Sequence, residues 1–433
     1  MVLDAARQRR FSYAPLPVIR QAQERRIRRT IAYAQAHVPY YRETMRRLIL
    51  TPGDFRTADD LARLPLIERE QLQRNPQYFV SELWPPKACV LLESGGSTGE
   101  PVTFFRNPPA LFAGAAHYER LRMVIGRLAG RPLRYREAAI LPPDSSTATA
   151  VSAFHARMQL PKDLRQKRRV FSMLRSPDEL LPELSDYRPD VISSYGSYLD
   201  ALFAHVREHR PPFTTPHVVV YGADSMSMAM REWVRDALGI EVLSSYGAIE
   251  APHIGFECER HHGYHLNVDL YPVRLIGADG RHVPPGAPGE VVVSNLVNAG
   301  TVLLNYRLGD LATLSETPCR CGRTLPLSSY LERTATAWLD LGGGRIVHAQ
   351  ALKAMLRHEQ ELWRYQIVQE ARSRLVVRLV PSPDCNRDLT ASRVHDQFRE
   401  LLPDGTAVRV EFLSDLPHGA SGKVQPVVPL PPE

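Results

Sequence analysis

The sequence predicts an α/β fold: a large N-terminal domain with parallel-rich sheets covered by helices plus a β-rich subdomain, and a small α+β C-terminal domain. Three observations predict it. Up to residue 262, short apolar runs alternate with helical patterns, which is typical of parallel sheets covered by helices. After residue 262 the chain becomes rich in strand patterns and Pro/Gly turns. Near residues 333–345 the pattern changes again, and the 433 residues are enough for two or three domains.

The elements of the N-terminal part follow from the apolar periodicity. A helical stretch covers residues 15–48 and breaks at Val38-Pro39, because the residue before a proline disfavours the helical conformation. Further helices are predicted at 57–63, 68–74, 108–128, 197–208 and 227–238. Strands are predicted at 88–92, 102–105, 137–141, 190–193, 217–221 and 240–244. The strand–helix–strand spacing favours parallel neighbours.

The two changes of pattern give the expected domain boundaries. Residues 1–333 form the large domain, with the β-rich subdomain at about 262–330. Residues 334–433 form the small domain, after a Gly-rich hinge or turn within 333–345. In the small domain we expect helices at 349–358 and 390–401 and strands at 364–369, 374–380 and 407–412.

Composition excludes several classes of protein. With 44% hydrophobic and 23% charged residues, the chain is neither disordered nor a coiled coil. The five cysteines are too sparse for a disulfide framework, and no signal peptide or apolar span is visible, so a cytoplasmic protein is expected. The net charge of +7 is small, and the arginines near residues 25–29 have the spacing of a solvated helix face. We therefore expect no nucleic acid and no membrane as partner.

A glycine-rich turn is the first candidate for chemistry. It lies between the strands expected at 88–92 and 102–105 and consists of Ser94, Gly95, Gly96, Ser97, Thr98 and Gly99. Three glycines allow a tight backbone, whose N–H groups bind anions such as phosphate, although an ordinary surface turn has the same composition. The turn has neither the Gly-Lys-Ser/Thr end of a P-loop nor the G-x-G-x-x-G dinucleotide pattern.

Four further segments strengthen the phosphate-binding interpretation because of their order along the chain. They are Ser245-Tyr246-Gly247-Ala248-Ile249-Glu250, Tyr306-Arg307-Leu308-Gly309-Asp310, Glu332-Arg333-Thr334, and Leu416-Pro417 followed by Ser421-Gly422-Lys423-Val424. With the turn, they resemble the adenylate-forming enzymes, which include acyl-CoA synthetases and adenylation domains. AHVPYYRE (36–43), LARLPLIERE (61–70), YRPDVISSYGSYL (187–199), VVVYGADSM (218–226) and CRCGRTLP (319–326) resemble the phenylacetate–coenzyme A ligase-like branch.

The resemblance implies an ATP-dependent ligase that activates a carboxylic acid as an acyl-adenylate, releases pyrophosphate and then transfers the acyl group. Coenzyme A is the expected acceptor, and an aromatic or related small organic acid is the expected substrate. An amine acceptor, giving an amide, is the main alternative, and a degenerate nucleotide-binding protein without turnover is another. Both reactants are anions, so such an enzyme needs Mg²⁺ and cationic or N–H donors. Relatives also imply a homodimer.

The same resemblance assigns roles to individual residues. Residues 94–99 would hold the β- and γ-phosphates of ATP, Glu250 would hold Mg²⁺, and Asp310 would accept hydrogen bonds from the ribose. Arg333 would reach the ribose or a phosphate, and Lys423 would bridge the acid and the α-phosphate from a mobile small domain. The adenine and acyl pockets would be lined by Gly222, Ala223, Asp224, Ser245, Tyr246 and Gly247.

A second group of residues has the chemistry of a metal site. The spacing of Cys258, His262, Cys319 and Cys321 predicts a closed structural zinc site, with His265 or His261 as alternatives to His262. The C-x-C spacing at 319–321 is tighter than the usual C-x₂-C, and reduced thiols beside a solvated histidine are the plain alternative.

Some positions depart from the resembled pattern. Glu100 stands where many relatives have lysine, and Ala335 and Thr336 replace polar hinge residues. Val268 stands where phenylacetate ligases tend to have a carboxylate, although Asp269 follows it.

Overall fold

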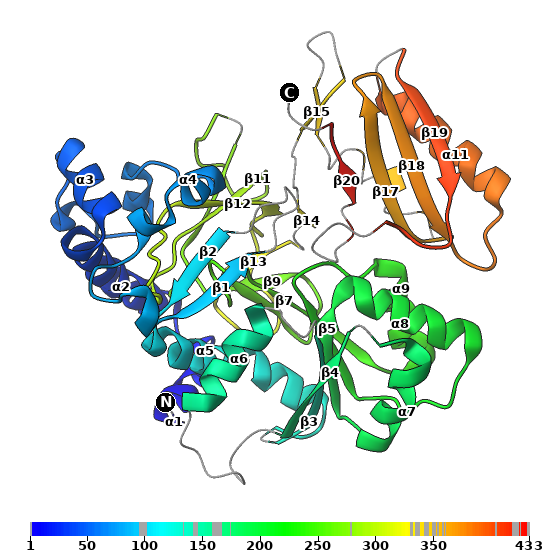
Figure 1. Cartoon of the computed structure of the whole chain (residues 1–433), viewed down its shortest axis with the longest axis horizontal. Coiled ribbons are helices and arrows are strands. Elements are labelled where there is room, and N and C mark those ends of the chain that lie inside the picture. The colour runs from blue at the N-terminus through cyan, green and yellow to red at the C-terminus, as the bar shows by residue number, and fades with distance from the viewer. Residues whose placement is uncertain are drawn as a thin grey trace.

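The structure is a computed structural model (Figure 1). It describes residues 2–94, 102–132, 134–141, 146–157, 167–173, 175–277 and 279–329 of the large domain. In the C-terminal part it describes residues 332–333, 338–341, 346–348, 352, 355–356, 359, 361–402, 405–417, 424 and 426–430.

An eight-stranded sheet forms the centre of the large domain. Its strand order is β13-β9-β8-β7-β6-β5-β3-β4. The strands β3 to β7 pair in parallel, and β8, β9 and β13 add an antiparallel edge. Their bounds are β3 (Arg136–Leu141), β4 (Lys167–Ser172), β5 (Val191–Tyr195), β6 (Val218–Gly222), β7 (Glu241–Tyr246), β8 (Gly255–Glu257), β9 (Tyr264–Leu266) and β13 (Leu327–Ser328).

Helices cover both faces of this sheet because its strands are apolar on both sides. Ile192, Val219 and Val242 pack against α7 (Pro177–Tyr187), α8 (Gly196–His209) and α9 (Met228–Leu238). The alternate positions Val191, Val218 and Leu243 pack against α1 (Val2–Phe11) and α5 (Pro108–Leu128). Such a doubly covered sheet binds ligands beyond the carboxyl ends of its strands.

The remaining N-terminal elements pack on a second sheet, of order β10-β11-β12-β14. Its strands are β10 (Val273–Ile276), β11 (Pro288–Val293), β12 (Tyr306–Thr313) and β14 (Glu332–Arg333). The helices are α2 (Leu16–His37), α3 (Pro39–Arg47), α4 (Arg69–Arg74) and four short 3-10 turns at Pro52–Asp54, Asp59–Arg63, Pro76–Phe79 and Pro86–Ala88. A separate antiparallel hairpin is made by β1 (Val90–Ser94) and β2 (Val102–Arg106), and α6 (Ser146–Arg157) contacts β1.

The described part of the small domain contains a four-stranded sheet of order β19-β18-β17-β20 with α11 packed on it. The elements are β17 (Leu362–Ala371), β18 (Arg374–Pro381), α11 (Arg387–Leu401), β19 (Ala407–Phe412) and β20 (Val427–Val428). A two-stranded sheet of β15 (Trp338–Asp340) and β16 (Ile346–His348) precedes it. Figure 1 shows this domain, in orange and red, beside α8 and α9 of the large domain.

The predicted fold class is confirmed, with differences in detail. The predicted helix at 108–128 agrees with α5, and the break at Val38-Pro39 separates α2 from α3. The sequence misses β4, because KRRVFS is a charged edge strand without an apolar run. Within the stretch expected to be a β-rich subdomain, β9 and β13 belong to the large sheet. Of the described helices, none combines the length and apolar composition needed to cross a bilayer.

Candidate active site and metal cluster

Two sequence-predicted segments follow neighbouring parallel strands at the same edge of the large sheet. Tyr195 at the end of β5 is in register with Gly222 at the end of β6, and Tyr221 is in register with Ser244 of β7. The strands β5, β6 and β7 therefore end side by side. This edge is the usual ligand-binding edge of a doubly covered sheet.

The turn Gly222-Ala223-Asp224 is held tightly at the end of β6. The N–H of Asp224 donates to the carbonyl of Gly222 at 2.8 Å, and Ala223 has a positive φ of 68°. The carboxylate of Asp224 accepts hydrogen bonds from the N–H and the hydroxyl of Ser197 at the start of α8. A non-glycine residue in the left-handed region costs free energy, so the turn is a strained element of this edge.

Glycine is required at Gly247, after β7, because another segment approaches its backbone. A Cβ on Gly247 would lie 2.1 Å from the carbonyl oxygen of Pro252. At Gly222 a Cβ would lie 2.7 Å from the hydroxyl of Ser245. The two glycines let the ends of β6 and β7 pack closely and bring the chain back toward the sheet.

Tyr246 and Asp310 are brought together although they lie far apart in the sequence. The Tyr246 hydroxyl donates to Oδ2 of Asp310 at 2.8 Å, and both residues are buried. Asp310 lies in β12, beside Gly309, where a positive φ of 73° accompanies a shift in the pairing register with β11. Such a bulge redirects a side chain, and here it accompanies the contact between the carboxylate and the end of β7.

Glu250 is also attached to β12. The Tyr306 hydroxyl donates to Oε1 of Glu250 at 3.3 Å, and Asn295 Nδ2 donates to the Glu250 carbonyl at 2.6 Å. Burial, followed by the charge of Glu250, raises the pKa of Tyr306 well above its ordinary value, so this hydroxyl remains a donor. Arg106, at the end of β2, donates to the carbonyl of Ile249 at 2.7 Å. Sequence reasoning gave no role to Tyr306 or Arg106.

Of the other residues predicted for the site, the structure describes Arg333 and Ser94. Arg333 of β14 pairs with Asp310 of β12, so its backbone lies next to the predicted ribose-binding carboxylate. Ser94 is the last residue of β1, in register with Val102, so the glycine-rich turn connects the strands of a hairpin. Gly95, Gly96, Ser97, Thr98, Gly99 and Lys423 lie outside the described residues.

A small cavity lies between α5 and the ends of β7 and β8. Ser245, Tyr246, His117 and His253 are in its wall, and its volume of about 10 Å³ has room for roughly one water. Nδ1 of His117 is buried and has no hydrogen-bond partner in the part of the chain that the structure describes. Burial lowers the pKa of His117 well below its ordinary value and that of His253 to about 3. Both imidazoles are therefore neutral near pH 7.

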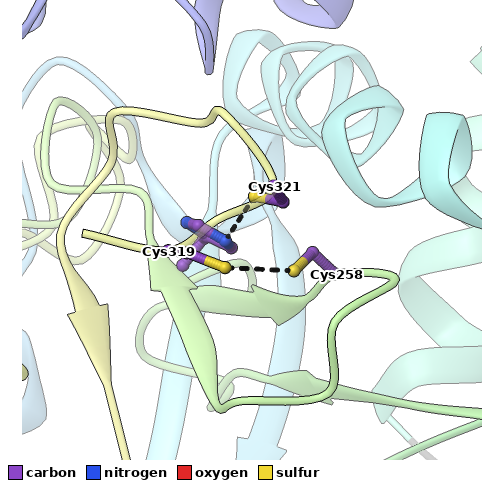
Figure 2. A group of neighbouring side chains, drawn as sticks. Cys258, Cys319 and Cys321 are labelled. Atoms are coloured by element: carbon purple, nitrogen blue, oxygen red, sulfur yellow. Dashed lines mark hydrogen bonds between the residues drawn. The ribbon is translucent and has the colours of Figure 1, made fainter. Parts of the chain in front are cut away.

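The second candidate site is a cluster of three cysteines and one histidine. The ligand atoms of Cys258, His265, Cys319 and Cys321 all lie within 4.8 Å of one another. Figure 2 shows the sulfur of Cys258 facing that of Cys319, and Cys321 facing an imidazole. The Cys258 and Cys319 sulfurs are 3.7 Å apart, and Nε2 of His265 is 3.2 Å from the Cys321 sulfur. Zn–S bonds of about 2.3 Å in a tetrahedron place two sulfurs about 3.8 Å apart.

The surroundings of the cluster favour a thiolate at Cys321. The hydrogen bond with Cys321 raises the pKa of Cys258, and burial raises the pKa of Cys319. The N–H groups of Arg260 and Arg323 point to the sulfurs of Cys258 and Cys321 at 3.4 and 3.5 Å. Hydrogen bonding from Cys258, followed by that from His265, lowers the pKa of the Cys321 thiol well below its ordinary value. Nδ1 of His265 faces the carbonyl of Leu325 at 3.4 Å, which leaves Nε2 for a metal. The donor set therefore fits a tetrahedral Zn²⁺.

The first-choice histidine, His262, is wrong, because it is exposed and does not belong to this cluster. His261 is not in the cluster either, since its two ring nitrogens face Glu257 and Glu241, each at 3.1 Å. His265 is the histidine in the cluster. It is in register with Phe256 of β8, and Cys258 lies two residues after Phe256, so both side chains point to one face. Strand alternation in the hairpin was the signal that favoured His265.

Comparisons with known proteins show which proteins this chain is similar to. A family model described as the CapK C-terminal domain matches residues 342–429. The phenylacetate–coenzyme A ligase of Thermus thermophilus is 27% identical over 369 residues, which cover 82% of this chain and 79% of that protein.

Solved structures with low sequence identity share the fold. A 2-hydroxyisobutyryl-CoA ligase in the postadenylation state, in complex with an adenylate (R3-HIB-AMP), has a TM-score of 0.73 at 16% identity and covers 97% of this chain and 91% of its own. The same ligase in the thioesterification state has a TM-score of 0.60 at 17% identity, with the same coverage of 97% and 91%. The amide bond synthetase McbA from Marinactinospora thermotolerans has a TM-score of 0.54 at 18% identity, covering 78% and 68%.

These comparisons confirm the resemblance that the sequence motifs predict. The chain has the fold of the adenylate-forming enzymes and is related to their phenylacetate–coenzyme A ligase-like branch. They also support the expected enzyme class, an AMP-forming acid–thiol ligase.

Proposed function

We propose that this relative of the phenylacetate–coenzyme A ligases joins a carboxylic acid to AMP, releases pyrophosphate and transfers the acyl group to coenzyme A. The observation that carries the proposal is the pair of contacts from β12 to the end of β7. The Tyr246 hydroxyl donates to Asp310 at 2.8 Å, and the Tyr306 hydroxyl donates to Glu250 at 3.3 Å. Both contacts join β12 to the segment 246–250 at the end of β7, so Glu250 and Asp310, the two carboxylates predicted for the nucleotide site, are attached to the same pair of segments.

Each carboxylate in this arrangement has a task in nucleotide binding. Tyr306 donates to one oxygen of Glu250, and carboxylate oxygens are the ligands that Mg²⁺ prefers, so we assign Glu250 to the metal. Tyr246 donates to one oxygen of Asp310, and this hydrogen bond orients the carboxylate that we assign to the ribose hydroxyls. Arg333, whose backbone pairs with that of Asp310, is assigned to the ribose or a phosphate. Residues 94–99 would bind the phosphates, and Lys423 would neutralise the charge that develops as the acid attacks the α-phosphate.

The expected acid, an aromatic or related small organic acid, is proposed from the similarity to the phenylacetate–coenzyme A ligases. The cavity beside Ser245 and Tyr246 has room for roughly one water, so it does not select among acids.

We assign a structural Zn²⁺ to Cys258, His265, Cys319 and Cys321. Four protein ligands complete a tetrahedron, so this ion has no open position for substrate. Its task is to attach the β8–β9 hairpin to the loop at 319–326, which leads from β12 to β13.

An amine acceptor is the second candidate, because the fold of an amide bond synthetase overlaps with 78% of this chain. Both candidates share the first half-reaction and differ in the second. Mass analysis of the product formed with coenzyme A or with a panel of amines distinguishes them.

Acid-dependent exchange of pyrophosphate into ATP tests the first half-reaction. We expect exchange with at least one acid from a panel of aromatic acids, hydroxylated aromatic acids and small hydroxy acids. A protein that binds ATP but shows no exchange with any of them would be the degenerate nucleotide-binding protein instead. Exchange without added acid would contradict the proposal.

A further inference from the structure

The large and small domains meet through α8 and α9 on one side and β17 on the other. Figure 1 shows the sheet of the small domain standing beside these two helices, and α9 contacts β17. Ser227 caps the N-terminus of α9, with its hydroxyl accepting from the N–H of Met230, and Gly239 caps the C-terminus with a positive φ of 65°. Both ends of α9 are therefore fixed, and the helix presents a defined surface to the small domain.

One arginine contacts aromatic rings from both domains. The guanidinium carbon of Arg207, on α8, lies 5.8 Å from the ring centroid of Trp233 on α9. The same atom lies 5.3 Å from the ring centroid of Trp363 on β17. Both distances are within the range of cation–π attraction, which is strongest with tryptophan. Arg207 thus connects a ring of the large domain with a ring of the small domain.

Ion pairs around Arg207 contribute little to the stability of the contact between the domains. Asp384 of the small domain is 4.0 Å from Arg207, but its side chain is 91% exposed, and exposed ion pairs are weak. On the other side of the contact, Arg364 of β17 carries a positive charge that acts on Asp200 of α8. Among the described residues, Arg207 is the arginine that lies over rings from both domains.

The arrangement of the two domains is more similar to the postadenylation state of 2-hydroxyisobutyryl-CoA ligase than to its thioesterification state. The same ligase overlaps with this chain better in its postadenylation state than in its thioesterification state, with TM-scores of 0.73 and 0.60 at equal coverage. Because both structures are of the same ligase and cover the same share of this chain, we infer that the difference in TM-score arises from the placement of the domains. The Arg207–Trp363 contact belongs to the arrangement nearer to the postadenylation state.

We propose that Arg207 is a positioning residue that stabilises the arrangement nearer to the postadenylation state by stacking between Trp233 and Trp363. The inference rests on the proposed two-step function. A contact made in only one of two arrangements shifts their populations by its own free energy. The stack favours the arrangement that holds the newly formed adenylate and has to break when the small domain moves for acyl transfer.

The test compares the two half-reactions in Arg207→Met and Trp363→Leu. Arg207→Met keeps the length of the side chain and removes the guanidinium. Pyrophosphate exchange reports adenylate formation, and single-turnover reaction of chemically prepared acyl-adenylate with coenzyme A reports transfer. We expect exchange to fall about tenfold, equivalent to about 1.4 kcal/mol, with transfer unchanged or faster. Arg207→Lys keeps the cation and should recover part of the exchange.

Arg235→Met is the matched control. Arg235 lies on α9 two residues after Trp233 and is half-exposed, and in the described part of the chain it forms an ion pair with Asp236 of the same helix. This variant should leave both half-reactions unchanged. An equal loss of both half-reactions in Arg207→Met, or no change in exchange, would overturn the inference.

Amide hydrogen exchange provides a readout that needs no substrate acid. In Arg207→Met, amides of residues 361–365 and of α9 should exchange faster, while those of α11, on the far side of the small-domain sheet, should be unchanged. If no acid supports pyrophosphate exchange yet these amides respond, the proposed function fails and the domain contact stands. Unchanged amide exchange would refute the contact itself.

Discussion

Two regions of the large domain are built differently: the cluster of Cys258, His265, Cys319 and Cys321, to which we assign zinc, and the sheet edge at the ends of β6 and β7, to which we assign the nucleotide and which we call the nucleotide edge. In the cluster, four donor atoms lie within 4.8 Å and complete one another, so no ligand position remains. At the nucleotide edge, Tyr246 and Tyr306 each donate to one oxygen of a carboxylate, and the partners that the proposal requires come from other segments. The comparison teaches that four donors close to one another suit a structural ion, while the carboxylates that we assign to the nucleotide are each oriented by a tyrosine hydroxyl from another strand or strand end.

The largest effect that separates the two regions is expected for Lys423→Ala. If the lysine neutralises charge during adenylate formation, its removal should lower acid-dependent pyrophosphate exchange about 100- to 1,000-fold. The melting temperature should not change. Lys87→Ala, at an exposed position in a 3-10 turn, is the control and should keep full exchange. Full exchange in Lys423→Ala would remove the lysine from the mechanism.

Loss of the proposed zinc should change the melting temperature, which Lys423→Ala should leave unchanged. Cys258→Ser should abolish zinc binding and lower the melting temperature, because the binding free energy of a structural zinc contributes directly to folding. Cys385→Ser is the control, since this cysteine lies in the small domain beside Thr390. Metal analysis of the purified wild-type protein with less than half an equivalent of zinc would refute the site.

A smaller effect is expected for Tyr246→Phe. The substitution removes the donor to Asp310 and should lower kcat/KM for ATP about tenfold, because hydrogen bonds to charged groups contribute about 1.5–3 kcal/mol. The control, Tyr41→Phe, removes a buried hydroxyl that donates to the carbonyl of Val302. The control should lower stability and leave KM for ATP unchanged. The same loss of kcat/KM in both variants would make Tyr246 a structural residue only.

The smallest effect concerns pH and lies outside both regions. Burial raises the pKa of Asp200 to about 7, against hydrogen bonds from Ser227 and the charge of Arg364. A carboxyl with a raised pKa in the folded state stabilises below its unfolded pKa, and this stability is lost as pH rises through about 7. The melting temperature of the wild type relative to Asp200→Asn should therefore increase from pH 7.5 to pH 5.5. A constant difference over this range would contradict the shift.

The sequence predicts the two regions to different extents for physical reasons. The ends of β6 and β7 can be predicted from the sequence because apolar runs end near Gly222 and Tyr246, and parallel strands end at one edge of a sheet. The sequence put His262 ahead of His265 as the fourth ligand because cysteine spacing alone does not say which way a side chain points. The pairing of β8 with β9 does, and it places His265 in the cluster. The contact between Arg207 and Trp363 joins residues 156 positions apart in different domains, so no local pattern predicts it.

The fate of oxygen in a labelled acid tests the central claim most directly. An acid with both carboxylate oxygens replaced by ¹⁸O attacks the α-phosphate through one of them, and acyl transfer then releases that oxygen with AMP. With the complete enzyme, ATP and coenzyme A, the account predicts one ¹⁸O in AMP and the other in the acyl product. AMP without ¹⁸O, or ¹⁸O in inorganic phosphate, would contradict it.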